Sequence, residues 1–392
     1  MTEIIHGSAY SRTWEPILSR WLRTVDRGLI VSVFVLYLLG LLLCFAATPH
    51  IADRMELDQF HFVYRQAAFG LIAIVVMLAI SALSTDSARR VGVVVFGMAF
   101  IGLLLLPILG TDYGKGAVRW FSLPFGSLQP SEFLKPGFVI VAAWFIAGSK
   151  QAAGPPGKRL SLGLAVLLVM LLAMQPDFGQ ASLIIFGWSV LYFMSGAAVF
   201  PLVGIAAAVV AAGVLFYNTS EHFARRISNY VSGEIGSNSQ LAIAMNAIQE
   251  GGFFGVGVGE GTVKRILPDA HTDFVVAVAA EEYGFGLVLI LIGIYCFICM
   301  RAFLLSGRAT DPFIRLAGNG LAAMFGVQAF IHIAVSAGLL PAKGLTLPFI
   351  SYGGSSMISI AVGLGMLLAF TRNASADSEE EDRRGRSVFF DE

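Results

Sequence analysis

The sequence predicts an all-α, polytopic integral membrane protein with about ten transmembrane helices. Hydrophobic residues make up 56% of the chain, and its mean hydropathy is +0.76. Charged residues make up only 13%, whereas a soluble domain typically carries about 25%. Apolar stretches of about 20 residues recur, each long enough to cross the hydrocarbon core of a bilayer. The short alternating strands of a transmembrane β-barrel are not seen in the pattern.

The apolar stretches define ten spans. They are predicted at 28–47, 66–84, 91–110, 131–148, 161–175, 178–195, 198–217, 274–300, 314–338 and 349–370. Only Gln175, Pro176 and Asp177 separate the fifth span from the sixth. Because a proline stops one helix and an aspartate can cap the next, this tripeptide predicts a tight turn between two helices.

The spans divide the chain into three parts. Residues 1–27 are predicted to form a cytoplasmic tail, 28–372 the transmembrane domain, and 373–392 a disordered cytoplasmic tail, since the last part is charged and poor in apolar residues. An even number of spans puts both termini on one side. Lys and Arg are more numerous in the loops on the side of the termini, so that side is predicted to be the cytoplasm.

Two segments outside the spans are expected to form short helices. Apolar residues between Trp14 and Val25 follow helical spacing beside Arg20, Arg23 and Arg27, which predicts an interfacial amphipathic helix. A large loop at about 218–273 is predicted outside the membrane, and its residues 240–250 could form a helix on the membrane surface.

Neither a nucleotide site nor a metal cage is indicated. Cys44, Cys296 and Cys299 lie in apolar runs and are interpreted as small buried side chains. The glycine-rich run 255–261 does not match the dinucleotide-binding pattern and is interpreted as a flexible loop. The formal net charge of zero gives no sign of a nucleic-acid partner.

A first polar cluster lies at the start of the fourth span. It comprises Lys115, Arg119, Trp120, Gln129, Glu132 and Lys135. Glu132 and Lys135 are three residues apart and can pair on one helix face. Two interpretations stay open: a local ion pair, or a basic pocket for an anionic lipid headgroup.

A second cluster, residues 267–273, directly precedes the eighth span. Asp273 taken alone is suited to capping that helix, and His271 to hydrogen bonding at the interface. Glu281 and Glu282 lie about two turns into the span, and we expect them to face the interior of the bundle because charge in lipid is costly.

A third segment, 340–356, contains several prolines and glycines that break helix. Broken backbone at membrane depth is tolerated where it lines a cavity or is buried in protein. The alternative is that its small residues simply allow close helix packing.

Together these segments resemble the signature of the SEDS family (shape, elongation, division and sporulation). The matching segments are Arg119-Trp120, Gln129-Pro130-Ser131-Glu132 with Lys135, Gln175-Pro176-Asp177-Phe178-Gly179, residues 267–274, Glu281-Glu282 and residues 340–356. They occur in the family's order over about 28–370, and Lys343-Gly344-Leu345-Thr346 resembles the division branch. Ser127 departs from the basic residue common at that position, which puts a headgroup contact there in doubt.

The resemblance implies a peptidoglycan glycosyltransferase that polymerises lipid II into glycan strands at the septum, on the outer face of the bacterial inner membrane. It implies a class B penicillin-binding protein transpeptidase, FtsI, and other division membrane proteins as partners. Asp273 matches the residue assigned as catalytic. The substrate-binding candidates are Arg65, Arg119, Gln129, Glu132, Lys135, His271, Lys343, Ser355 and Ser356. No cofactor is indicated, and a Mg²⁺ or Mn²⁺ ion bridging the pyrophosphate stays open.

Two other functions would suit the same chain. A lipid II flippase would share the cavity and the basic residues but make no polymer. A scaffold for other division proteins would act through its tails and tolerate substitution of Asp273.

Overall fold

The computed structural model of the chain describes residues 17–390. Outside this description lie residues 113–117, 125, 151–153, 342–343 and, between 220 and 239, all but 221, 224 and 228. Before residue 21 and after residue 372 it describes the backbone alone.

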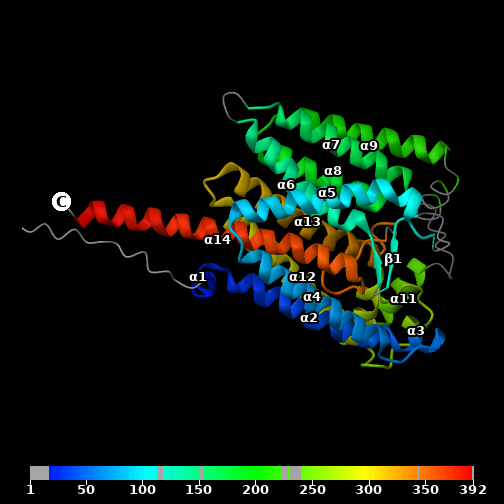
Figure 1. Cartoon of the computed structure of the whole chain (residues 1–392). Coiled ribbons are helices and arrows are strands. Elements are labelled where there is room, and N and C mark those ends of the chain that lie inside the picture. The colour runs from blue at the N-terminus through cyan, green and yellow to red at the C-terminus, as the bar shows by residue number, and fades with distance from the viewer. Residues whose placement is uncertain are drawn as a thin grey trace, which may run out of the picture.

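Long helices running side by side make up most of the described chain (Figure 1). They are α2 (Arg27–Ala47), α4 (His61–Ser81), α5 (Thr85–Leu109), α6 (Pro130–Gly148), α7 (Gly157–Met174), α8 (Phe178–Met194), α9 (Phe200–Thr219), α12 (Val275–Gly307), α13 (Pro312–Ser336) and α14 (Gly354–Phe390). Within the described residues, nine of them are long and apolar enough to cross a membrane, and the remaining apolar helix, α8, has 17 residues. Each of the ten predicted spans therefore coincides with a helix, and the multi-pass membrane fold is confirmed.

The short elements gather at one end of the bundle. They are α3 (Pro49–Arg54), the antiparallel strands β1 (Phe121–Leu123) and β2 (Gly126–Leu128), α11 (Gln240–Gly251) and the 3₁₀ turn η1 (Val263–Arg265). Figure 1 places α3, β1 and α11 opposite the end that carries α1 (Ile17–Thr24) and the far end of α14. The predicted helix at 240–250 is confirmed, whereas the small hairpin was not predicted.

Two terminal segments differ from their predictions. The helix α14 continues to Phe390, where a disordered tail was predicted from residue 373. Glu379 and Glu380 stand four residues before Arg383 and Arg384, a spacing that favours helix. The predicted amphipathic helix is present as α1, but its Trp21 donates a hydrogen bond to the Ser81 hydroxyl at 2.9 Å, so it also rests on the bundle. Trp14 lies outside the described residues.

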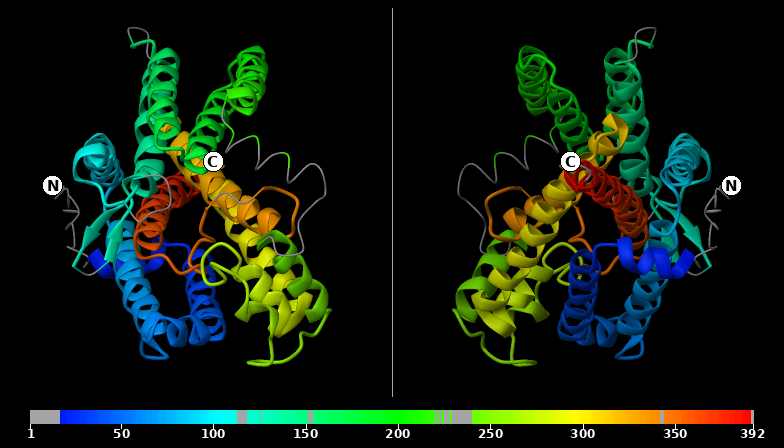
Figure 2. Two further views of the ribbon diagram at one scale, coloured as in Figure 1. Left: turned by 90° about the vertical axis from the view of Figure 1, so that its right-hand side faces the viewer. Right: turned by 90° about the vertical axis from the view of Figure 1, so that its left-hand side faces the viewer.

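The centre of the bundle is formed by α6, α13 and α14, most of whose spanning residues are buried. The end-on views in Figure 2 place the C-terminal helix (red) near the centre and α9 (green) at the outer edge. In agreement, α9 has no buried residue. Glu132, Lys135, Glu281 and Glu282 are all buried, which confirms that the acidic pair of α12 faces the interior.

A kink divides α12 close to its N-terminal end. Gly284 has φ +82°, and a methyl group there would lie 2.2 Å from the carbonyl oxygen of Phe253. The N–H of Phe285 donates to the Gly252 carbonyl at 2.9 Å, and that of Val256 to the Glu281 carbonyl at 2.8 Å. The glycine-rich segment, interpreted above as a flexible loop, is thus bonded to α12, because only glycine allows two backbones to come so close.

Candidate functional site

The segment that carries Asp273 is joined to the segment before α14. The backbone N–H of Tyr352 donates to the carbonyl oxygen of His271 at 2.9 Å. The hydroxyl of Ser351 donates to the carbonyl oxygen of Thr272 at 2.6 Å. The second and third sequence motifs therefore form one unit, although α12 and α13 lie between them in the chain.

Asp273 does not cap α12. The N-cap residue is Phe274, which makes no capping bond through its side chain, and the N–H of Asp273 donates to the Asp269 carbonyl at 3.0 Å. The Asp273 side chain is partly exposed, and a methyl group added to Gly344 would lie 3.9 Å from its Oδ2. The capping alternative is wrong, because the helix begins two residues later. The carboxylate instead lies against the 344–345 backbone.

His271, two residues before Asp273, packs against two aromatic rings. Its ring centroid is 5.4 Å from that of Phe62 and 5.5 Å from that of Tyr352. Burial raises the pKa of Tyr352, and the nearby charge of Arg65 acts in the opposite direction. A methyl group on Gly126 in β2 would lie 3.4 Å from the Arg65 guanidinium. Arg65 thus lies between the hairpin and the aromatic cluster that holds His271.

Glu132 and Lys135 form a buried ion pair inside the bundle. The Lys135 ammonium is 2.7 Å from Glu132 Oε2 and donates to Gln328 Oε1 at 2.8 Å. The other carboxylate oxygen of Glu132 accepts from the Gln180 amide at 2.6 Å. The predicted local ion pair is therefore present. Since a buried charge requires such compensation, Lys135 is held in place by its partners and is not an open surface cation.

This ion pair is connected to the segment before α14. Gln328 accepts a hydrogen bond from the Lys135 ammonium at Oε1, and its Nε2 donates to the Thr346 carbonyl at 2.9 Å. The Thr346 and buried Ser356 hydroxyls are hydrogen-bonded to each other. Ser355 is half-buried in the first turn of α14. The first and third motifs are thus in contact through α13.

Arg119 and Gln129 bind the turn between α7 and α8. The Arg119 guanidinium donates to the carbonyl oxygens of Gln175 and Pro176 at 3.0 and 2.6 Å. The Gln129 amide donates to Asp177 Oδ2 at 3.3 Å. Asp177 also accepts from the Gln180 N–H, as predicted for a helix cap. In this structure Arg119 therefore holds the backbone of the turn, and Gln129 holds the side chain of Asp177.

The chain matches the FtsW/RodA/SpoVE family of cell cycle proteins over residues 27–376. It is 39% identical over 365 residues to a protein of Caulobacter vibrioides named "Probable peptidoglycan glycosyltransferase FtsW", with 93% of each chain covered. A protein of the same name from Alkalilimnicola ehrlichii is 34% identical, with 92% of this chain and 93% of the relative covered.

This chain belongs to the FtsW/RodA/SpoVE family. The resemblance to the division branch of the SEDS family is thereby confirmed. The fold is similar to that of a chain in a peptidoglycan synthase complex that coordinates polymerization and crosslinking, with TM-score 0.74, 28% identity, and 89% of this chain and 98% of that chain covered. It is also similar to the rod shape determining protein RodA of Thermus thermophilus, with TM-score 0.66, 29% identity, and coverage of 89% and 97%.

Two residues of the sequence motifs, Lys115 and Lys343, are not among the described residues, and a bridging metal ion was left open by the sequence. Lys343 lies outside the described part of the chain, although its neighbours Gly344 and Leu345 are within it. Among the described residues, no three His, Cys, Asp or Glu side chains gather as a metal site.

Lys264 is a buried charge that the sequence did not single out. Its ammonium forms an ion pair with Glu282 and donates to the Ala46 carbonyl in α2 at 3.0 Å. The two carboxylate oxygens of Glu281 accept from the N–H groups of Val263 and Lys264 at 2.7 and 2.9 Å. The acidic pair of α12 thus fixes the loop leading to Asp273. The available signal was a lysine in the loop that precedes α12, a helix whose buried acidic pair requires charge compensation.

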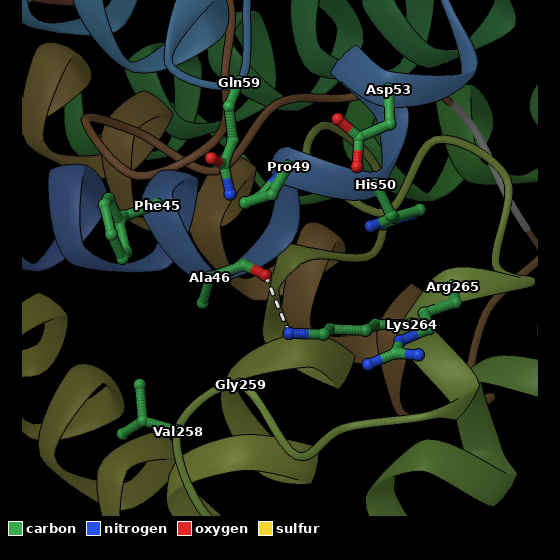
Figure 3. Close-up of a pocket in the computed structure, with 10 residues that line it drawn as sticks. All are labelled: Phe45, Ala46, Pro49, His50, Asp53, Gln59, Val258, Gly259, Lys264 and Arg265. Atoms are coloured by element: carbon green, nitrogen blue, oxygen red, sulfur yellow. Dashed lines mark hydrogen bonds between the residues drawn. The ribbon is translucent and has the colours of Figure 1, made fainter.

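A cavity of about 480 Å³ opens between α2, α3 and this loop. Figure 3 shows the Lys264 side chain extended toward the Ala46 carbonyl, with which it forms a hydrogen bond, and His50 and Arg265 on one side of the group. The remaining lining residues are Phe45, Pro49, Asp53, Gln59, Val258 and Gly259. The pKa of His50 is lowered, chiefly by burial and then by the charges of Lys264, Arg54 and Arg265. The cavity therefore carries charges of both signs, with Asp53 and Arg265 in its lining and Lys264 paired to Glu282, and the sequence did not predict it.

Proposed function

We propose that Asp273 is the general base with which this chain, a peptidoglycan glycosyltransferase, polymerises lipid II into glycan strands. A sugar hydroxyl is a weak nucleophile. A positioned carboxylate that takes its proton during attack contributes about 10²–10⁴-fold to the rate. The hydroxyl oxygen of the acceptor sugar bonds to the anomeric carbon of the donor, the bond to the lipid pyrophosphate breaks, and the proton passes to the carboxylate.

The position of Asp273 carries this proposal. It is a partly exposed carboxylate that is not used as a helix cap. It also lies where the segments 271–273 and 344–352 are bonded together. Its backbone is held through the Ser351 and Tyr352 contacts of its neighbours, so the carboxylate is carried on a fixed support. Such fixing is what a general base needs, since misplacement by about 1 Å can cost about 10²-fold in rate.

The leaving pyrophosphate requires cations. Arg65 and Lys343 are our candidates, and Arg265 offers a further guanidinium in the large cavity. Charge-assisted hydrogen bonds from such groups neutralise phosphate oxygens. Lys135, buried in its ion pair, acts by linking α6 to α13 through Gln328. Arg119 and Gln129 act in a similar way, by holding the turn between α7 and α8.

We further propose a class B penicillin-binding protein transpeptidase as the partner and the division septum of the inner membrane as the location, with both termini cytoplasmic. The likeness to a chain of a peptidoglycan synthase complex supports the first point. The common end shared by α1 and the far end of α14 supports the placement of both termini on one side.

The test compares lipid II polymerisation by purified wild-type and Asp273→Asn proteins at matched amounts of folded transpeptidase complex. Asparagine keeps the size of the side chain but cannot take the proton, so almost no polymer is expected. Asp269→Asn is the matched control. It lies in the same loop at φ +52°, a conformation that asparagine tolerates, and it should polymerise normally. Near-normal polymer from the Asp273→Asn protein would exclude the base role.

The same assay separates the competing functions. If the chain is a flippase without polymerase activity, even the wild-type protein will make no polymer from supplied lipid II. A scaffold would support division with Asp273→Asn and fail when its tails are removed. Synthesis of glycan strands that depends on Asp273 contradicts both.

A further inference from the structure

His332 lies in α13 with its ring turned toward the segment that supports Asp273. The side chain is buried, and its Nδ1 is 2.6 Å from the carbonyl oxygen of Leu345. A carbonyl oxygen only accepts hydrogen bonds, so Nδ1 must carry the proton and donate. In the neutral ring the other nitrogen, Nε2, then presents a lone pair and is an acceptor.

The Nε2 atom of His332 is buried and has no hydrogen-bond partner among the described residues. A buried polar atom left without a partner pays its desolvation cost with nothing to offset it. Native structures usually satisfy such an atom with protein or ordered water. This acceptor therefore points to a donor that is not a side chain of the described bundle.

A small cavity supplies the place for that donor. It has a volume of about 10 Å³ and is lined by His332, Asp273, Val335, Gly344 and Leu345. A cavity of about 10–15 Å³ holds one water molecule. Among the described side chains that line it, the imidazole of His332 and the carboxylate of Asp273 are the polar ones, and both are acceptors in these protonation states.

We infer that one water molecule bridges His332 Nε2 and the Asp273 carboxylate, and that His332 is a positioning residue for this carboxylate. Water has two O–H donors, one for each acceptor, so a single molecule satisfies both. The bridge limits rotation of a side chain that is otherwise partly exposed. The inference rests on the proposed role of Asp273 as the base. It adds that the base is oriented from α13 through a fixed imidazole tautomer.

Three substitutions at His332 separate this role from a purely structural one. His332→Leu removes both the Leu345 bond and the acceptor. His332→Gln can place its amide oxygen near the position of Nε2 but gives up the Leu345 bond. His332→Asn can keep the Leu345 bond through its amide N–H, while its oxygen does not reach as far as Nε2.

We expect His332→Leu to lower kcat for lipid II polymerisation by about 10²-fold, the cost of misplacing a catalytic group by about 1 Å, with KM nearly unchanged. His332→Gln should restore most of kcat. If His332→Gln is as inactive as His332→Leu while His332→Asn matches wild type, His332 serves only to hold Leu345 and the inference is wrong. Wild-type kcat in the His332→Leu protein overturns it as well.

A second measurement does not depend on activity or on the folding of a variant. A map of the wild-type transpeptidase complex that resolves water should show one peak within about 2.6–3.2 Å of both His332 Nε2 and an Asp273 carboxylate oxygen. An empty, well-ordered cavity would refute the bridge. Asp273→Asn is assayed in parallel: if that protein polymerises normally, the proposed function fails, whereas loss there combined with full activity of His332→Leu rejects this inference alone.

Discussion

Replacing Lys264 by methionine should destabilise the loop that precedes Asp273. The Lys264 ammonium is the ion-pair partner of Glu282, whose side chain has 0% exposure. It also reaches the Ala46 carbonyl in α2. Methionine fills similar space but leaves the Glu282 charge buried without compensation. Breaking a buried pair from one side costs about 3–5 kcal/mol.

This cost converts into a measurable shift in melting temperature. The unfolding entropy of globular proteins is about 2.1 cal/mol/K per residue, so a chain of 392 residues has about 0.8 kcal/mol/K. A loss of about 3–5 kcal/mol therefore lowers the melting temperature by about 4–6 °C. Thermal unfolding of the detergent-solubilised variants, followed by tryptophan fluorescence, gives this value directly.

Two further variants decide whether the ion pair is the cause. The double substitution Lys264→Met with Glu282→Gln removes both charges and should regain much of the lost stability. Arg265→Met is the matched control, because Arg265 directly follows Lys264 and its side chain is exposed. This substitution should shift the melting temperature by less than about 1 °C on the same scale. A Lys264→Met protein as stable as wild type would show that Glu282 is accommodated without its cation, and the argument from burial would be wrong.

Three further predictions concern the bundle, pH and topology. Lys135→Ala leaves the buried Glu132 without its cation and should lower polymerisation of lipid II. Lys135→Arg should rescue it only partly, because the guanidinium fork does not match the ammonium geometry. Unchanged polymerisation kinetics in Lys135→Ala would show that activity does not depend on this ion pair. Because the pKa of His50 is lowered in the folded chain, the unfolded chain binds more protons, so stability is lost as pH falls through about 6.5. His50→Gln should therefore reduce the drop in melting temperature between pH 7.5 and 5.5, and an unchanged drop would assign it to other groups. A cysteine placed at position 155 should not react with a membrane-impermeant reagent in intact cells, and labelling there would invert the proposed topology.

The sequence was sufficient for the spans and for several local features. Stretches of about 20 apolar residues have few stable environments other than lipid, so their positions follow from composition alone. The cap at Asp177 and the ion pair between Glu132 and Lys135 are also local, because their partners lie within three residues. The helix at 240–250 followed in the same way from a short run of helix-forming residues.

The joining of the motifs was decided by tertiary structure. Gln328 links Lys135 to Thr346, and Ser351 links to Thr272, across long separations in the chain. Helices that are apolar nearly all round give little periodicity from which to read the inward face, so these contacts could not be derived from spacing.

The same reason explains what the sequence missed or misjudged. Asp273 has a residue type suited to capping, but the helix starts after Phe274, and only the fold shows the carboxylate beside Gly344. Lys264 and His332 appeared as an ordinary loop lysine and an ordinary histidine in a span. Their roles depend on which groups the folded chain buries opposite them, Glu282 for the first and the cavity shared with Asp273 for the second. Composition determined that the chain lies in a membrane, whereas the packing of helix faces determined which polar groups meet there.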